Sequence, residues 1–407
     1  MSVFQNEKIC SYIFIDVRII IPINKTYNDN IIMIYLDTAA SYPIIPEVKK
    51  VLLEAFENSF ANSTSSHLLG EQVSDEIKKV REQLADEIGA YPSEIVFTSG
   101  ATESNNIAFK SLLLGKEIPN DKKHIVTTQI EHKCIFSICD YLKVQGFEVT
   151  YIKPNQFGII EVDSIVKAIR EDTALVSVMH VNNELGTINP IAEIGKACFD
   201  AGVLFHSDAA QSFQKVDIDV DDLNVDVMSF SAHKIGGPKG IGAVYIRDLR
   251  KRHLMPIIHG AGQEDGLRGG TVAAPLIIGF GTAITFFKEH YNKFKKKEIK
   301  AYFLNKLTKI KVLYKENGQL TLEHCLSITL PCTDTETLLR DNEQTVCLAQ
   351  GSACSSKEIE PSHVLTAIGL DRELAEHTFR ISFPLDVSTD NLDYLITQIN
   401  KATHMKC

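Results

Sequence analysis

The sequence predicts an α/β fold, in which helices cover both faces of a mostly parallel sheet, followed by a smaller α+β domain. Short apolar runs alternate with helical stretches from about residue 70 to about residue 285, and this alternation is typical of parallel sheets. Beyond that point strands and helices follow without regular alternation. With 407 residues, 44% of them hydrophobic, the chain is long enough for two domains of ordinary size.

The elements follow from their hydrophobic periods. Apolar side chains three and four residues apart predict an amphipathic helix over residues 71–90: Val73, Ile77, Val80, Leu84 and Ile88. Short apolar runs predict strands over residues 94–100, 124–129, 147–152, 174–181, 203–208 and 226–232. In the second domain we expect strands over 325–330 and 379–383, and helices over 334–342 and 388–403.

These patterns predict the domain boundaries. We expect a large domain over residues 51–285 and a small domain over residues 286–407, with residues 33–50 packing against the small domain. Residues 1–32 form an atypical N-terminal extension, because the regular pattern begins only at "MIYLDTAA". The apolar run "ICSYIFIDVRIIIPI" is interrupted by Asp16 and Arg18, is too short to span a bilayer and lacks the basic region of a signal peptide. We expect a chain that starts at Met33, without membrane contact, in the cytoplasm.

Composition excludes several classes of function. Lys and Arg number 42 against 52 Asp and Glu, and a net charge of −10 argues against direct nucleic-acid binding. The basic run "KFKKKEIK" at 293–300 is interpreted as a solvated helix face, with a docking patch for an acidic partner or an RNA as the alternative. The nine cysteines include no CxxC pair, so we predict no metal site and expect reduced thiols.

Polar residues follow nearly every predicted strand of the large domain. The segments are "SGATESNN", "IEHK", "NNELG", "DAAQS" and "HKIGGPKG". Because ligands of open α/β sheets bind beyond the carboxyl ends of the strands, we expect these segments to meet at one site.

Three of these segments carry groups that suit pyridoxal phosphate. Lys234 precedes a tight glycine turn, and a lysine held at a strand end can form a Schiff base with an aldehyde, although most lysines are solvated. Asp208 is either a helix N-cap or the carboxylate that keeps a pyridine nitrogen protonated. Gln211 could then hydrogen-bond the phenolic oxygen of the ring.

The other segments suit the phosphate and the face of the ring. Gly100, Ala101 and Thr102 open a helix directly after a strand, where amides and the helix dipole favour an anion, and Ser231 and His233 could add donors. His132 is either structural or placed to stack on the ring and move protons. Cys354 lies in "QGSACSSKE", a composition typical of a mobile loop, either by chance or because its thiol must move.

The motifs "SGATESNN", "EHK", "MHVNNELG", "HSDAAQS", "SFSAHKIGGPKGIG" and "GSACSS" resemble those of the cysteine desulfurases. These are pyridoxal-phosphate enzymes of the class V aminotransferase group, and the resemblance spans residues 34–395. It implies the large type I fold of pyridoxal-phosphate-dependent transferases, with a seven-stranded sheet. The "GSAC" loop resembles that of the branch that serves iron–sulfur clusters, including the nitrogenase type, and thio-modification.

The resemblance also implies a role for each site residue. Lys234 would hold the cofactor, Asp208 would pair with its pyridine nitrogen, and His132 would stack on the ring and shuttle protons. Gln211 and Asn183 would contact the phenolic oxygen side, and the phosphate would be held by Ala101, Thr102, Ser231 and His233. Thr271 resembles a residue that reaches the phosphate of the partner subunit, which implies a homodimer. Arg380 would bind the α-carboxylate of cysteine, beside Asn183.

The implied reaction converts L-cysteine to L-alanine and leaves a persulfide on Cys354 for a sulfur-acceptor or scaffold protein. The sulfur could go to iron–sulfur clusters, tRNA thiolation or DNA phosphorothioation. A selenocysteine lyase or another lyase of the same fold is the alternative. A non-enzymatic scaffold would have lost Lys234, Asp208 or Cys354, and all three are intact. The sequence departs from the family pattern at three positions: Gly269, Ser63 and Glu71.

Overall fold

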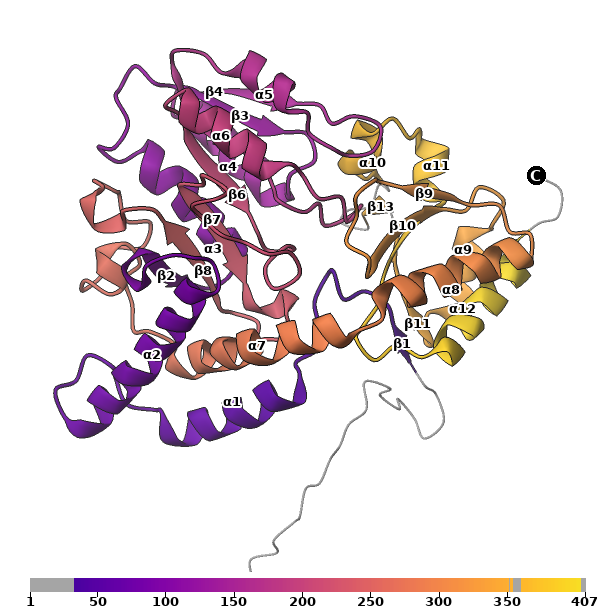
Figure 1. The fold of residues 1–407 in the computed structure, drawn as a ribbon, viewed down its shortest axis with the longest axis horizontal. Helices are drawn as coiled ribbons and strands as arrows, with labels where there is room; N and C mark the ends of the chain where they lie inside the picture. Colours follow the sequence, from indigo (N-terminus) through magenta and orange to yellow (C-terminus); the bar gives the residue numbers. More distant parts are fainter. Residues whose placement is uncertain (1–32, 351, 354–359, 404–407) are drawn as a thin grey trace, which may run out of the picture.

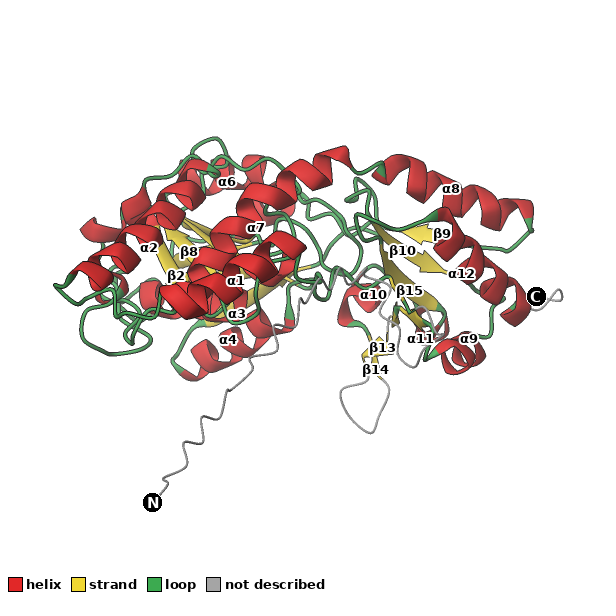
Figure 2. Ribbon diagram, turned by 90° about the horizontal axis from the view of Figure 1, so that it is seen from below, coloured by secondary structure: helices red, strands yellow, loops and turns green. Residues whose placement is uncertain are grey.

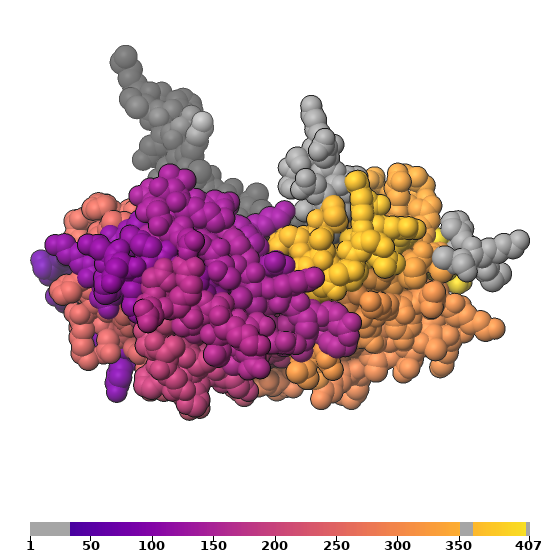
Figure 3. Space-filling model, turned by 90° about the horizontal axis from the view of Figure 1, so that it is seen from above, coloured from indigo at the N-terminus to yellow at the C-terminus, as the bar shows by residue number. Residues whose placement is uncertain are grey.

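The computed structural model describes residues 33–350, 352–353 and 360–403, so Cys354 and the expected extension over residues 1–32 lie outside the described residues. A large domain and a small domain lie side by side (Figure 1). The long helix α7 (Ala274–Lys293) runs along the large domain and leads into α8 (Lys296–Lys309) of the small one. The space-filling view shows the two domains in contact over a broad seam (Figure 3).

The large domain is built on a seven-stranded sheet, which confirms the predicted fold class. The strand order is β2-β8-β7-β6-β5-β3-β4, and only β8 runs antiparallel to its neighbours. The strands are β2 (Ile95–Thr98), β3 (His124–Thr128), β4 (Glu148–Ile152), β5 (Thr173–Ser177), β6 (Leu204–Asp208), β7 (Val227–Ser231) and β8 (Gly242–Ile246). Strand β8 was not among the six apolar runs, and β5 ends four residues earlier than its run predicts.

Successive residues of the central strands face two different cores, as the period of two in a strand requires. Val227 packs in one cluster and Met228 in the other, and Leu175 and Val176 divide in the same way. One face is covered by α2 (Leu68–Asp86), α5 (Val162–Ala168), α6 (Ile191–Asp200) and α7. The other is covered by α4 (Lys133–Val144) and by α3 (Ala101–Asn106) with the π-helical residues Ile107–Ser111 that continue it. Figure 2 shows the sheet between these helices.

The small domain has its own core. Its antiparallel sheet has the order β12-β15-β10-β9, formed by β9 (Lys315–Asn317), β10 (Cys325–Thr329), β12 (Ala349–Gln350) and β15 (Thr378–Ser382). The helices are α8, α9 (Thr335–Asn342), α10 (His363–Ala367), α11 (Arg372–Glu376) and α12 (Thr389–Ala402). A short hairpin of β13 (Ser352–Ala353) and β14 (Glu360–Pro361) completes it.

The N-terminal segment crosses from one domain to the other. Strand β1 (Ile34–Tyr35) pairs in parallel with β11 (Val346–Cys347) of the small domain. Contacts with the large domain begin at Ala39, whose carbonyl oxygen accepts from Lys234 Nζ at 2.8 Å, and continue where the Tyr42 amide donates to His233 O at 2.8 Å and α1 (Pro46–Asn58) packs on α7. The Tyr42 hydroxyl still accepts from the Leu385 amide of the small domain at 2.8 Å. The sequence placed residues 33–50 with the small domain, and the segment contacts the large domain as well.

Two further features concern location and thiols. Among the described helices, none is long and apolar enough to cross a bilayer. Free thiols are found at Cys134, Cys139, Cys198, Cys325 and Cys347. Cys332 is disulfide-bonded, so the expectation of reduced thiols is wrong at that position.

Candidate active site

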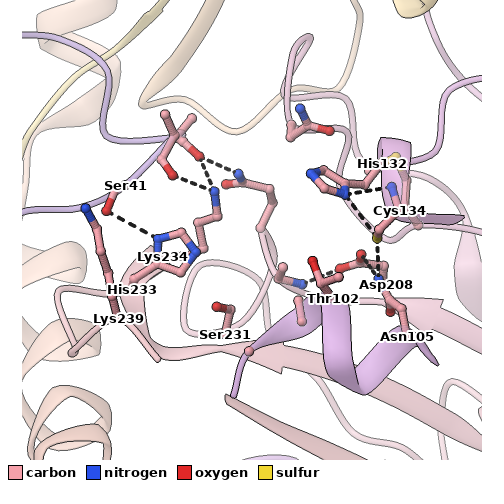
Figure 4. A pocket seen from close by; sticks show the side chains of 18 of the residues that line it. Ser41, Thr102, Asn105, His132, Cys134, Asp208, Ser231, His233, Lys234 and Lys239 are labelled. Carbon is pink, nitrogen blue, oxygen red and sulfur yellow. Dashed lines mark hydrogen bonds between the residues drawn. The ribbon is translucent and has the colours of Figure 1, made fainter. Parts of the chain in front are cut away.

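A cavity of about 650 Å³ lies where the strand ends of the large domain meet the N-terminal segment and the small domain. Most of the predicted site residues line it, from six separate segments: Ala101, Thr102, His132, Asn183, Asp208, Gln211, Ser231, His233, Lys234 and Arg380. Thr271 is exposed and does not line this cavity. Figure 4 shows the polar side chains pointing into the space between them.

The lysine loop follows β7 and carries Lys234 at the end of a 3₁₀ turn. Its Nζ donates to Ala39 O and Ala40 O, each at 2.8 Å. Burial lowers the pKa of Lys234 to about 8, and the Arg380 guanidinium also lowers it. The carboxylates of Asp208 and Asp37 act in the opposite direction and raise it. A lysine with this pKa has an appreciable fraction of neutral amine near neutral pH, which is the form that attacks an aldehyde.

The glycine after this lysine has a structural reason. Gly236 has a φ of +73°, a conformation that side chains rarely adopt, and a Cβ there would lie 2.6 Å from Ile45 Cγ2. The lysine loop therefore needs glycine both for its turn and for its contact with the N-terminal segment.

Asp208 ends β6 and is almost completely buried. Its Oδ2 accepts from Asn105 Nδ2 at 2.7 Å and its Oδ1 from the Ala210 amide at 2.9 Å. Turns rather than a helix follow it over residues 210–215, so it is not a helix N-cap. A buried carboxylate that faces a cavity can bind a protonated ring nitrogen, as the functional interpretation requires.

His132 is the N-cap of α4 and also lines the cavity, so it combines the structural and the functional interpretation. Its Nδ1 accepts from the Cys134 amide at 3.2 Å and lies 3.0 Å from Cys134 Sγ. Burial lowers its pKa, and the ammonium of Lys234 lowers it further, while Asp208 opposes both. The ring is therefore neutral at physiological pH and can exchange protons with a ligand.

The predicted phosphate end lies near the start of α3. Ala101 and Thr102 form its first turn, and Ser231 and His233 come from the end of β7 and the loop after it. Burial lowers the pKa of His233 to about 4, with Lys234 and Lys239 acting in the same direction. Its Nδ1 lies 3.2 Å from Ser41 Oγ.

Arg380 reaches the cavity from β15 of the small domain. Its guanidinium donates to Asn183 O at 2.7 Å and to Asp37 Oδ1 at 2.5 Å. Its Nε is buried and has no hydrogen-bond partner among the residues that the structure describes. A substrate carboxylate is the kind of group that would satisfy this donor.

The strap, by which we mean Asp37–Ser41, is the part of the site that sequence reasoning missed. Ala39 O accepts from Gln211 Nε2 at 2.7 Å as well as from Lys234, and Asp37 pairs with Arg380. The cavity is also lined by Cys134, Asn105 and Lys239, which were not singled out. Asn105 sits in the quoted "SGATESNN" and Cys134 two residues after His132, so their motifs were the available signal.

The three departures from the family pattern lie outside the cavity lining. A Cβ at Gly269 would lie 2.6 Å from both Gly260 N and Gly260 Cα, so glycine fits the close packing of these two backbones. The neighbouring Arg268 donates to Glu103 Oε1 at 3.0 Å and ties this loop to α3. Glu71 is exposed in the first turn of α2, where its carboxylate interacts favourably with the helix dipole. Ser63 lies in the turn that precedes this helix.

Comparison with known proteins gives a consistent result. The model of the class-V aminotransferase family matches residues 34–395. The chain is 42% identical over 384 residues to the mitochondrial cysteine desulfurase of Candida maltosa, which covers 90% of this chain and 77% of that protein. It is 41% identical over 392 residues to the cysteine desulfurase IscS of Rickettsia bellii, covering 93% and 94%. The solved structure of SspA in complex with cysteine is similar with a TM-score of 0.78 and 43% identity, covering 86% of this chain and 99% of that chain.

Proposed function

Because the chain belongs to the class-V aminotransferase family, we propose that it is an L-cysteine desulfurase. The observation that carries the proposal is the convergence of an amine, a buried carboxylate and a guanidinium on one cavity, from Lys234, Asp208 and Arg380. The relatives named above are cysteine desulfurases, and one solved relative holds cysteine.

The cofactor of this family is pyridoxal 5′-phosphate, and the residues around the cavity fit it. Lys234 offers the amine that would hold its aldehyde, and the acceptor-only carboxylate of Asp208 suits a protonated ring nitrogen. The phosphate would be held by the first turn of α3 together with Ser231 and His233. When bound, the cofactor withdraws electrons from the substrate carbon and so weakens the C–S bond.

The side chains of the site then have distinct tasks. Arg380 binds the substrate carboxylate through its unused Nε–H, beside Asn183. His132 holds a neutral imidazole over the cavity and transfers protons. Burial lowers the pKa of the free Lys234 amine to about 8, so this amine can serve as a second base when it is not bonded to the cofactor.

Sulfur leaves the substrate through Cys354. Its thiolate attacks the substrate sulfur, an S–S bond forms and the C–S bond breaks, and the carbon keeps the electron pair and takes up a proton. L-Cysteine and the enzyme thiol thus become L-alanine and an enzyme persulfide. We propose that an acceptor or scaffold protein takes this sulfur.

The test is alanine and sulfide release from L-cysteine in the presence of a reductant. We expect the Cys354→Ala variant to lose sulfide release by about 10²-fold or more, because it lacks the thiol that we propose attacks the substrate sulfur. Cys347→Ala removes a thiol seven residues earlier in the chain and should keep the wild-type rate. Equal rates in Cys354→Ala and wild type would disprove the persulfide step.

We also propose a homodimer in which Thr271 serves the partner's site. Four large apolar side chains are more than 60% exposed on α1, on the loop that follows it and at the start of α2: Leu53, Phe56, Phe60 and Leu68. Such a patch is typical of an interface. Thr271 is exposed and lies in the loop that Arg268 ties to α3.

Mixing two inactive variants tests this arrangement. Thr271→Ala and Lys234→Ala subunits, exchanged to form hybrid dimers, should recover activity in the one site that has both intact residues. No recovery in proven hybrids would contradict the shared site. A Phe56→Glu variant should shift the sedimentation of the dimer toward that of a monomer.

The cellular location and the sulfur acceptor are proposed on the same basis. We propose a cytoplasmic enzyme, while noting that the relatives include both bacterial and mitochondrial proteins. Capture of the acceptor with the persulfidated enzyme, compared with Cys354→Ala, would identify the pathway among cluster assembly, tRNA thiolation and DNA phosphorothioation.

A further inference from the structure

Four polar side chains form a hydrogen-bonded chain along one side of the cavity (Figure 4). Asn105 Nδ2 donates to Asp208 Oδ2 at 2.7 Å and to Cys134 Sγ at 3.3 Å. Cys134 Sγ lies 3.0 Å from His132 Nδ1. The chain therefore joins Asp208 to His132 through Asn105 and Cys134, two residues without an assigned role.

The direction of each hydrogen bond follows from the one before it. Asp208 is an acceptor only, so it fixes the amide of Asn105 with Nδ2 toward it. The second hydrogen of the same Nδ2 then points to the sulfur of Cys134. Because this sulfur accepts from Asn105, its own hydrogen is free to point to His132 Nδ1.

The thiol of Cys134 keeps that hydrogen at physiological pH. Burial raises its pKa to about 11, and Asp208 acts in the same direction, while Asn105 and Thr102 lower it as hydrogen-bond partners. A thiol in this state is a donor and not a nucleophile. This distinguishes it from the thiol that we propose carries the sulfur.

His132 Nδ1 thus receives two hydrogens, from the thiol and from the backbone amide of Cys134. A nitrogen that accepts cannot also carry a proton, so the proton of the neutral ring must lie on Nε2. Within the described residues Nε2 has no hydrogen-bond partner. We propose that Cys134 is a positioning residue, held by Asn105 and Asp208, that fixes the tautomer and orientation of His132 so that Nε2–H serves the substrate.

The proposal rests on the proposed function of His132, but its direct consequence is independent of activity. Donors to Nδ1 favour the neutral ring, so loss of the thiol should raise the pKa of His132. The other charged and titratable groups that act on this ring are Asp208, which raises its pKa, and Lys234, His363 and Lys133, which lower it. All of these stay in place when only Cys134 is changed.

The test is a pH titration of ¹⁵N-histidine-labelled holoenzyme by NMR, with the His132 signals assigned by their loss in His132→Gln. In wild type we expect Nδ1 as the acceptor nitrogen and Nε2 as the protonated one. Cys134→Ala should raise the pKa of His132 by about 0.5 unit, since one modest hydrogen bond is lost. Cys134→Ser keeps a donor and should stay within about 0.2 unit of wild type. Cys139→Ala removes a buried thiol of the same helix that lies in the core and should cause no shift.

Three results would overturn the proposal: a proton on Nδ1 in wild type, an unchanged pKa in Cys134→Ala, or an equal rise in the serine and alanine variants. The pH profile of kcat/KM for L-cysteine adds a second readout. The apparent pKa in this profile that belongs to His132 should shift by the same amount as the pKa of His132 measured by NMR. If the profile is absent because cysteine is no substrate, the proposed function fails while the NMR result still decides the role of Cys134.

Discussion

The two sides of the cavity are built in different ways. The floor, formed by Asp208, Ser231 and Lys234, comes from the buried ends of adjacent strands of one sheet. The wall, formed by the strap and Arg380, joins segments 343 residues apart through Asp37. The residues that we propose for the chemistry thus lie in the large domain, whereas the proposed substrate recognition by Arg380 depends on how the small domain and the strap pack against it.

The largest expected effect is on the floor. Lys234→Ala should reduce alanine release by about 10³-fold or more, because it removes the amine that we propose holds the cofactor and serves as a base. The visible absorption band of the bound cofactor should be lost or shifted. Lys196→Ala, on an exposed face of α6, is the matched control and should retain both. An active Lys234→Ala enzyme would place the chemistry elsewhere.

The wall should affect recognition more than chemistry. Arg380→Ala should lower kcat/KM for L-cysteine by about 10²-fold, the cost of a lost charge-assisted contact. Asp37→Asn should raise KM by about tenfold with kcat within about twofold, since Arg380 is then less firmly held. Steady-state kinetics at several cysteine concentrations separate the two parameters. If Asp37→Asn lowers kcat alone, the strap acts on the chemistry of the floor and not on substrate recognition.

Two glycine-to-alanine variants test the contact between Ile45, four residues after the strap, and the lysine loop of the floor. Gly236→Ala combines a positive φ with a Cβ 2.6 Å from Ile45, whereas Gly146→Ala has a φ of +89° and nothing within 4 Å. Thermal or denaturant unfolding should show about 1 kcal/mol lost for Gly146→Ala and about 2–3 kcal/mol for Gly236→Ala. Equal losses would mean that the contact between Ile45 and the lysine loop adds nothing.

The smallest effect concerns a buried acid beside the floor. Burial raises the pKa of Glu131 from 4.5 to about 8, although Met179 N and Thr128 Oγ1 donate to its carboxyl. Between pH 4.5 and about 8 the folded state therefore keeps a proton on Glu131 that the unfolded state has released. The stability that this proton contributes to the folded state is fully present below pH 4.5 and is lost as the pH rises to about 8. Glu131→Gln mimics the protonated form. Between pH 6 and 8 its melting temperature should fall less steeply than that of the wild type, with a difference in slope of about 2 °C per pH unit. Parallel pH dependences of the two proteins would contradict a protonated Glu131.

The floor could be predicted from the sequence because strand and motif coincide. Asp208 ends one apolar run and Lys234 lies two residues after another, and strands that alternate with helices must bring their ends to one edge. The wall could be predicted only in part. Arg380 was found through the resemblance, while its partner Asp37 carries no local signal that it pairs with a residue in the last strand of the other domain.

The amino-acid sequence by itself determined six of the seven strands of the sheet and the identity of the chemical groups at its edge, because side-chain periodicity is a local property of the backbone. Only the tertiary structure decided that the strap accepts from Lys234 and Gln211, that Asp37 holds Arg380, and that Cys134 and Asn105 join Asp208 to His132. These contacts form between segments that are distant in the chain. The hydrophobic pattern of each segment does not show which residues of another segment it will contact.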